Sequence, residues 1–390
     1  MTGKVLLVAG ARPNYMKIAP IWWAMRERAA ERFMPVLVHT GQHYDDSMSG
    51  AFFRDLGLPE PAINLGVGSA SHAAQTAKVM TGFEQVLLAE RPAAVVVVGD
   101  VNSTAACALV TAKIDLRTDL GGDGRPVRPV LAHVEAGLRS RDRDMPEEVN
   151  RVVADALSDV LFTTCRDAGE NLECEGLPRE RIRFVGNPMI DSLRRCLAAA
   201  NGGDLLERLG LAGRPFGLCT LHRPSNVDHP DVLERLLDTL AEVAAEAPVL
   251  LPLHPRTRAR IAGFGLGERI ASPARPARGV PERGLVGVEP LTYLEMLQVM
   301  RAAAFVLTDS GGVQEETTAL GVPCVTLREN TERPVTITEG TNVLAGLARR
   351  SILDALAEAR RKAANGTRVP ELWDGRAGER IVAVLAEVGA

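Results

Sequence analysis

The segment PVLAHVEAGLRSRDRDMPEEVNR, residues 129–151, gives the clearest indication of the fold. Residues 129–134 form a short apolar run typical of a buried strand, and Glu135 follows this run directly. Pro146 suits the first position of a helix, and Glu147 and Glu148 suit its first turn because the helix dipole favours acids there. A strand, a loop and a helix in this order are typical of an α/β fold.

The helix predicted from Pro146 has one apolar face, because apolar residues recur at helical spacing. They are Val149, Val152, Val153, Ala156 and Leu157. Glu135 then lies at the carboxyl end of a strand and Glu147 at the amino end of a helix, at the edge where open α/β sheets bind ligands. Such acids could serve proton-transfer or glycosidic chemistry, or could be a structural carboxylate and an acid that complements the helix dipole.

The composition excludes several classes of protein. A chain of 390 residues with 46% hydrophobic and 4% aromatic residues suits two domains with parallel sheets covered by helices. The net charge of -4, without a basic block, argues against nucleic acid and anionic membranes as partners. The six cysteines form no CxxC pair, which argues against zinc and against a disulfide framework. No apolar run approaches the ~18 residues of a membrane span, so a soluble cytoplasmic protein is expected.

Two α/β units follow one another along the chain. The first has predicted strands at residues 5–8, 36–38, 94–98 and 129–134, with helical stretches such as 18–30 between them. The alternation restarts with the predicted strands at residues 216–221, 249–253, 285–286, 305–307 and 322–327. We place the joint between the units at Gly186-Asn187-Pro188.

Candidate site residues of the first unit lie at its predicted strand ends. Gly10-Ala11-Arg12-Pro13 follows the first strand, and Arg12 and Lys17 add positive charge that suits a phosphate or sugar. This turn lacks the GxGxxG pattern of dinucleotide binding, and a plain turn remains the alternative. Asp100 ends a strand of four valines, where it could be catalytic, orient a ligand or cap the next helix.

The second unit carries histidines and a glycine-rich turn at its strand ends. His222 and His254 could exchange hydrogen bonds with a substrate oxygen, or be structural histidines. Ser310-Gly311-Gly312 opens a helix and predicts an anion site, with a Ser-capped turn as the alternative. Glu316 could accept from ribose hydroxyls, and Arg333 lies in a charged loop that could equally be solvated.

The motifs GARPNYMK, GD, HVEAGLRS, MPEEVNR, TLHRPSN, DSGGVQEE and RENTERP, in this order from residue 10 to residue 334, resemble those of the non-hydrolysing UDP-N-acetylglucosamine 2-epimerases. That family has two Rossmann-like domains facing a cleft, in the glycosyltransferase-B arrangement. The resemblance implies an N-terminal domain at residues 1–187, with a helix at 373–390 packed back on it, and a UDP-binding domain at 188–372. It also implies conversion of UDP-N-acetylglucosamine into UDP-N-acetylmannosamine by elimination and re-addition of UDP.

The resemblance implies a role for each matching residue. The catalytic residues are Asp100, Glu135, Glu147 and His222. The substrate-binding residues are Arg12 and Arg333 near the diphosphate and sugar, Ser310, Gly311 and Gly312 at the diphosphate, Glu316 at the ribose and Tyr293 by the uracil, to which we add Lys17 and His254 from their positions. The family needs no nicotinamide and no metal and is commonly dimeric, so a homodimer with a UDP-sugar substrate is expected.

Several alternatives remain open at this stage. The substrate could be a modified sugar such as a UDP-2,3-diacetamido-glucuronic acid, or the enzyme could hydrolyse its product to free N-acetylmannosamine and UDP. A glycosyltransferase or a non-catalytic sugar-nucleotide sensor would have less use for several acids. Two departures from the family pattern are Asn14, where many relatives have Glu, and Tyr44-Asp45-Asp46, where allosteric relatives present Arg after Gln-His. The second departure predicts an enzyme without activation by a second UDP-N-acetylglucosamine.

Overall fold

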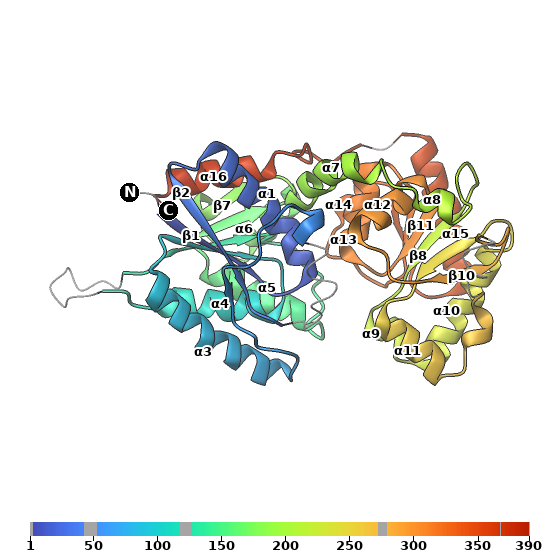
Figure 1. The fold of residues 1–390 in the computed structure, drawn as a ribbon, viewed down its shortest axis with the longest axis horizontal. Coiled ribbons are helices and arrows are strands. Elements are labelled where there is room, and N and C mark those ends of the chain that lie inside the picture. The colour runs from blue at the N-terminus through green and yellow to red at the C-terminus, as the bar shows by residue number, and fades with distance from the viewer. Residues whose placement is uncertain (1–2, 43–52, 118–126, 272–278, 367, 390) are drawn as a thin grey trace. The chain divides into compact units, whose positions relative to one another are not determined.

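The computed structural model describes residues 3–42, 53–117, 127–271, 279–366 and 368–389 (Figure 1). The chain forms two compact units. Unit 1 comprises Met1–Ser192 and Glu371–Ala390, and unit 2 comprises Leu193–Pro370. The division falls inside helix α7 (Pro188–Ala200), a little beyond the joint placed from the sequence at its first residue.

Unit 1 is built on a parallel seven-stranded sheet in the order β3-β2-β1-β4-β5-β6-β7. From β1 the strands are added toward one edge as far as β3, and from β4 they are added toward the other edge as far as β7. The switch in strand order therefore lies between β1 and β4, and ligands bind at such switch points in open α/β sheets. The strands are β1 (Gly3–Ala9), β2 (Phe33–His39), β3 (Ile63–Asn64), β4 (Ala94–Val98), β5 (Val130–Val134), β6 (Val160–Thr163) and β7 (Ile182–Phe184). The helices are α1 (Arg12–Arg28), α3 (His72–Glu90), α4 (Asn102–Lys113), α5 (Pro146–Leu157), α6 (Arg166–Cys174), η1 (Arg179–Arg181) and α16 (Ala377–Glu387), the last packed against α1.

Unit 2 is built on a parallel six-stranded sheet in the order β10-β9-β8-β11-β12-β13. The strands are β8 (Gly217–Thr220), β9 (Val249–Pro252), β10 (Leu285–Val288), β11 (Phe305–Thr308), β12 (Cys324–Thr326) and β13 (Asn342–Leu344). The helices after α7 are α8 (Leu205–Arg208), α9 (Pro224–Val227), α10 (Pro230–Val243), α11 (Pro255–Gly263), η2 (Gly267–Arg269), α12 (Tyr293–Ala302), α13 (Gly311–Leu320), α14 (Val335–Thr338) and α15 (Arg349–Ala364). The α/β class with two parallel sheets, predicted from the sequence, is confirmed.

The central strands form the cores of both units. All five residues of β4 are buried, as its run of valines predicts, and so are all four residues of β11. Helices α3, α4 and α5 pack side by side in unit 1, with α4 between the other two (Figure 1). Among the described residues, no helix combines the length and the apolar composition that crossing a membrane requires.

The predicted apolar face of α5 is not the face that the helix buries. Val149 and Val152 are 43% and 38% exposed, whereas Glu148, Arg151 and Asp155 are buried. These three charged residues also share one side of the helix, at i, i+3 and i+7. The helix turns this charged side inward because groups from other segments pair with each of the three charges.

Candidate functional site

The carboxyl ends of β1, β4 and β5 lie side by side, and they bring three predicted site residues together. Lys17, on α1, forms an ion pair with Glu135, which follows β5; their side chains are only 6% and 4% exposed. The Gly99 turn, after β4, lies against this pair, because a Cβ added there would come within 2.9 Å of Lys17 Nζ and 3.4 Å of Glu135 Oε2. Glycine at position 99 therefore lets the Glu135 carboxylate and the Lys17 ammonium approach the backbone beside Asp100.

Glu135 has an unusual backbone conformation. Its φ of 72° lies in the left-handed region, which costs a residue with a side chain about 1–3 kcal/mol. The strain is held in place by β6, because the backbone N–H groups of Glu135 and Ala136 both donate to the Phe162 carbonyl at 3.1 Å. Such outliers concentrate at functional sites, so the conformation supports a chemical role for Glu135.

Asp100 is held by α5. The N-cap residue of the following helix α4 is Val101, whose side chain makes no capping hydrogen bond. Arg151 Nε lies 3.1 Å from Asp100 Oδ2, and Asn150 Nδ2 donates to the Asp100 carbonyl at 2.9 Å. Arg151 thus fixes the carboxylate of Asp100, and Asn150 fixes its backbone.

The two acids at the start of α5 have different surroundings. Glu148 is buried and accepts from Ser140 N at 3.0 Å and from Arg141 N at 2.9 Å, and it also pairs with Arg151. It therefore stabilises the loop between β5 and α5. Glu147 is exposed in the first turn of the helix, where the dipole favours its anionic form. Of the two, Glu147 is the one that a substrate could reach.

The first loop of unit 1 is closed by Asn14. Its Oδ1 accepts from Gly10 N at 2.9 Å and from Ala11 N at 3.0 Å, and its Nδ2 donates to the Val98 carbonyl at 3.3 Å. Asn14 thus ties the turn after β1 to the end of β4. Arg12 is the first residue of α1, but its side chain lies outside the described part of the structure, as do residues 43–46 of the second sequence departure.

In unit 2, the side chain of Asp309 organises the predicted catalytic histidine. Its carboxylate lies 2.8 Å from His222 Nδ1 and accepts from the backbone N–H groups of His222 and Arg223, both at 2.9 Å. Burial alone would raise the pKa of Asp309, but hydrogen bonds from His222 and its charge hold that pKa below the ordinary value. Asp309 therefore fixes the ring through Nδ1.

His254 lies beside His222, with their ring centroids 5.9 Å apart. It is exposed and is the N-cap of α11, where its Nδ1 accepts from Arg256 N at 3.3 Å. Nδ1 therefore carries no proton, and in the neutral ring Nε2 is the donor.

The amino end of α13 has no side-chain cap. Ser310 is its N-cap residue but makes no capping hydrogen bond, so the Ser-capped alternative is wrong and the helix keeps backbone N–H groups that suit an anion. Arg333 packs on this turn, because a Cβ added at Gly311 would lie 2.5 Å from Arg333 NH1. Glu315 and Glu332 hold Arg333 at 3.2 and 3.3 Å, and all three are buried. Arg333 and Glu332 of the charged loop are therefore buried, whereas Glu329 of the same loop is exposed.

Glu316 and Tyr293 form a buried pair. The Tyr293 hydroxyl donates to Glu316 Oε1 at 2.9 Å. Burial, opposed by this hydrogen bond and assisted by Glu315, raises the pKa of Glu316 to about 7. Burial and the Glu316 carboxylate also raise the pKa of Tyr293 well above its ordinary value. Tyr293, predicted to lie by the uracil, is thus hydrogen-bonded to Glu316, the acid predicted to bind the ribose.

The raised pKa of Glu316 predicts a pH-dependent loss of stability that Glu316→Gln should remove. The folded protein keeps a proton that the unfolded chain releases above pH 4.5, so wild-type stability falls as pH rises toward about 7. The fall is at most about 3 kcal/mol, since each pKa unit corresponds to about 1.4 kcal/mol. We expect urea unfolding at pH 5 and pH 8 to show this fall in wild type and in the exposed control Glu282→Gln, but not in Glu316→Gln. Parallel pH dependences would contradict it.

Several residues of the site give no clear signal in the sequence. Arg151 and Asp155 read as the solvated side of an amphipathic helix, and His133 reads as part of an apolar strand. Asp309 precedes the glycine turn and could have been suspected, because an acid at a strand end of a parallel sheet is unusual unless it is paired.

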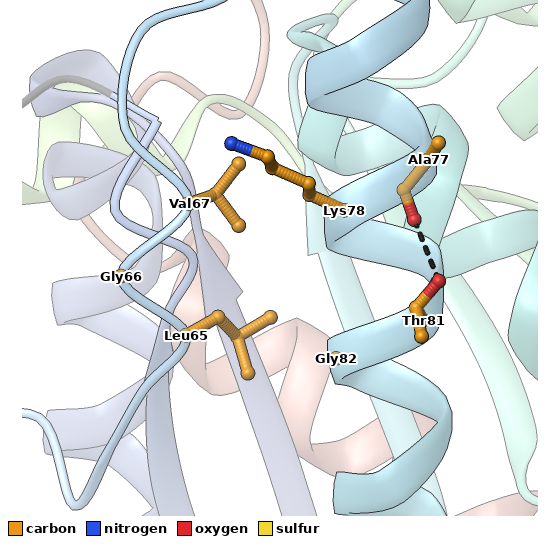
Figure 2. A pocket seen from close by; sticks show the side chains of 7 residues that line it. All are labelled: Leu65, Gly66, Val67, Ala77, Lys78, Thr81 and Gly82. Carbon is orange, nitrogen blue, oxygen red and sulfur yellow. Dashed lines mark hydrogen bonds between the residues drawn. The ribbon is translucent and has the colours of Figure 1, made fainter.

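A separate hollow in unit 1 contains none of the predicted site residues (Figure 2). It lies between the segment after β3 and helix α3, where Val67 faces Lys78 and Leu65 faces Gly82 (Figure 2). The Thr81 hydroxyl donates to the Ala77 carbonyl of the same helix at 3.0 Å, so this hydroxyl is already used. The strand ends described above, rather than this hollow, gather the chemical groups.

The chain is similar to known sugar-nucleotide epimerases over nearly its whole length. The family model described as UDP-N-acetylglucosamine 2-epimerase matches residues 26–386. The UDP-N-acetylglucosamine 2-epimerase of Methanocaldococcus jannaschii is 36% identical and covers 98% of both chains. Its crystal structure in complex with UDP-GlcNAc and UDP matches with a TM-score of 0.84 over 98% of this chain and 99% of that chain. The UDP-2,3-diacetamido-2,3-dideoxy-D-glucuronate 2-epimerase of Pseudomonas aeruginosa is 38% identical over 90% of this chain and 91% of its own length.

Proposed function

The chain belongs to the UDP-N-acetylglucosamine 2-epimerase family, a family of isomerases, and from this premise we propose that it converts UDP-N-acetylglucosamine into UDP-N-acetylmannosamine. The observation that carries the proposal is the meeting of Asp100 and the strained, buried Glu135 at adjacent strand ends of unit 1. A binding protein would gain little from desolvating acids in this way.

The chemistry requires acid and base groups because the C2 hydrogen of the sugar is not acidic. We propose that a carboxylate removes the C2 proton while the C1–O bond breaks and its electron pair leaves with UDP, so that a C1=C2 double bond forms. The product of this elimination is 2-acetamidoglucal. UDP then adds back at C1, and an acid delivers a proton to the opposite face of C2. The candidates for these transfers are Asp100, Glu135 and Glu147.

Unit 2 supplies the nucleotide contacts in this proposal. The uncapped N–H groups of α13, with Arg333 beside them, suit the two phosphates and the charge that develops when UDP departs. Glu316, whose Oε1 accepts from Tyr293, suits the ribose hydroxyls, because these donate to carboxylate oxygens. His222, held by Asp309 through Nδ1, presents Nε2 for hydrogen bonding to the diphosphate or the sugar.

The function is tested by incubating the protein with UDP-N-acetylglucosamine in D2O and recording proton NMR spectra. We expect two UDP-sugars in equilibrium, each carrying deuterium at C2, because the proton removed exchanges with solvent before one returns. Free N-acetylmannosamine and UDP would instead indicate a hydrolysing enzyme. Unchanged substrate would contradict the proposal.

A second candidate substrate is favoured by the Pseudomonas aeruginosa relative, which is named for a UDP-2,3-diacetamido-glucuronate. The residues described here act on C1, C2 and the nucleotide, and none of them is assigned to C3 or C6. The same D2O experiment with that sugar nucleotide shows whether the enzyme acts on it. If it acts on both, the sugar nucleotide with the higher kcat/KM is the preferred substrate.

The homodimer predicted from the resemblance remains a prediction. It is supported by the exposed apolar side of α5, where Val149 and Val152 lie one turn apart.

A further inference from the structure

The imidazole of His133 lies inside unit 1, and both of its nitrogens have partners. His133 belongs to β5, and none of its side chain is exposed. Its Nε2 lies 2.8 Å from the carbonyl oxygen of Gly99, and its Nδ1 lies 2.6 Å from Asp155 Oδ1. The ring therefore joins the turn after β4 to helix α5.

The partners of His133 determine how many protons the ring carries. A carbonyl oxygen only accepts, so Nε2 must carry a proton. Asp155 also accepts from Gly137 N at 3.1 Å and pairs with Arg139 at 2.8 Å. Because a backbone N–H and a guanidinium both point at this carboxylate, Asp155 is an acceptor toward Nδ1 as well. With both nitrogens donating, the ring is an imidazolium.

The group that this imidazolium holds is the peptide that precedes Asp100. Gly99 has a left-handed φ of 65°, and its N–H donates to the Val134 carbonyl at 3.0 Å. His133 fixes the carbonyl of the same residue, and Asn150 fixes the carbonyl of Asp100. Hydrogen bonds therefore hold the turn at successive positions, and the direction of the Asp100 side chain depends on them.

We propose that His133 is a positioning residue for the reaction, which, as a buried imidazolium clamped by Asp155, holds the Gly99–Asp100 turn and so directs the Asp100 carboxylate. This inference rests on the proposed function, in which Asp100 is one of the acids. His133 itself touches no reacting atom. A neutral ring would leave either Gly99 or Asp155 with an unsatisfied acceptor in the interior of unit 1, which is unfavourable.

Two conservative variants separate positioning from a structural role. Glutamine at position 133 places its amide NH2 where Nε2 lies and can still donate to Gly99, whereas asparagine is shorter and can donate only toward Asp155. We expect His133→Asn to lower kcat by about 10²-fold at an unchanged KM, because a small misplacement of a reacting group costs about that much. His133→Gln should keep kcat within about tenfold of wild type. Equal losses in the two variants, or the reverse order, would overturn the inference.

The charge of the ring is tested in the wild-type protein, whether or not the variants fold. Spectra of wild-type protein labelled with 15N-histidine, with the His133 ring assigned through bonds from its own backbone, should show N–H protons on both ring nitrogens. A ring with one N–H proton overturns the inference and leaves the proposed function intact. A wild type with the doubly protonated ring but no epimerase activity overturns the proposed function instead.

Discussion

Glu135→Gln and Glu147→Gln are each expected to lower kcat by about 10²–10⁴-fold, which corresponds to about 3–5 kcal/mol of activation free energy. Glutamine keeps the shape of glutamate but neither accepts nor delivers a proton at neutral pH. Both variants should still bind UDP, because they leave the nucleotide contacts proposed for unit 2 in place. Steady-state turnover of UDP-N-acetylglucosamine and calorimetric UDP binding measure the two properties separately.

The two variants should differ in stability, and this difference identifies the cause of each loss. Glu147 is exposed, so its replacement should lower the unfolding free energy by no more than about 1 kcal/mol, the contribution of an exposed charge to the helix dipole. Glu135→Gln leaves the buried Lys17 ammonium without its counter-charge, which costs about 3–5 kcal/mol when a buried pair is broken. The double variant Lys17→Met with Glu135→Gln removes both charges and should recover stability but not turnover. Recovery of turnover in the double variant, or near-wild-type turnover in a single one, would show that the acid concerned has no chemical role.

The positions of the acids in the sequence predict where they lie but not what surrounds them. Asp100 and Glu135 were identified because each ends an apolar run, and parallel strands of one sheet end at the same edge. The partner of Glu135, Lys17, lies far away in the sequence, and no local pattern reveals which charge is paired. Pairing across the sheet is decided by the packing of α1 over β1, β2 and β4, which periodicity does not describe.

Helix α5 shows why periodicity alone can identify the wrong buried face. The spacing of Val149 and Val152 and that of Arg151 and Asp155 are equally helical, and apolar residues are usually the buried set. Here the charged set is buried because Asp100, after β4, pairs with Arg151, and His133, on β5, pairs with Asp155. A buried charge that is paired and hydrogen-bonded is tolerated, so tertiary contacts, and not hydropathy, decide the orientation of this helix.

Asp309→Asn is expected to lower kcat by about 10²–10⁴-fold, because it should invert the tautomer of His222. An Asp-to-Asn change of this kind costs about 10⁴-fold in a serine protease. The asparagine oxygen can still accept from the backbone N–H groups of His222 and Arg223, which leaves its NH2 group facing His222 Nδ1. Nδ1 must then accept, and Nε2 becomes the proton carrier. Asp228→Asn, another carboxylate of unit 2 that is bound to Arg256, is the matched control and should keep its turnover.

A double-mutant cycle decides whether Asp309 acts through His222 or merely stabilises unit 2. Residues that act as one unit give losses that are not additive. If Asp309 serves to orient the ring, Asp309→Asn should cost little further turnover in a His222→Asn background, where no ring remains to be oriented. Additive losses would mean that Asp309 contributes independently, through the loop that its carboxylate joins to β11. Because Asn226 also donates to the Leu327 carbonyl at 3.0 Å, that loop keeps a hydrogen bond to the segment after β12 in every variant. The cycle therefore compares folded proteins and reports on the histidine itself.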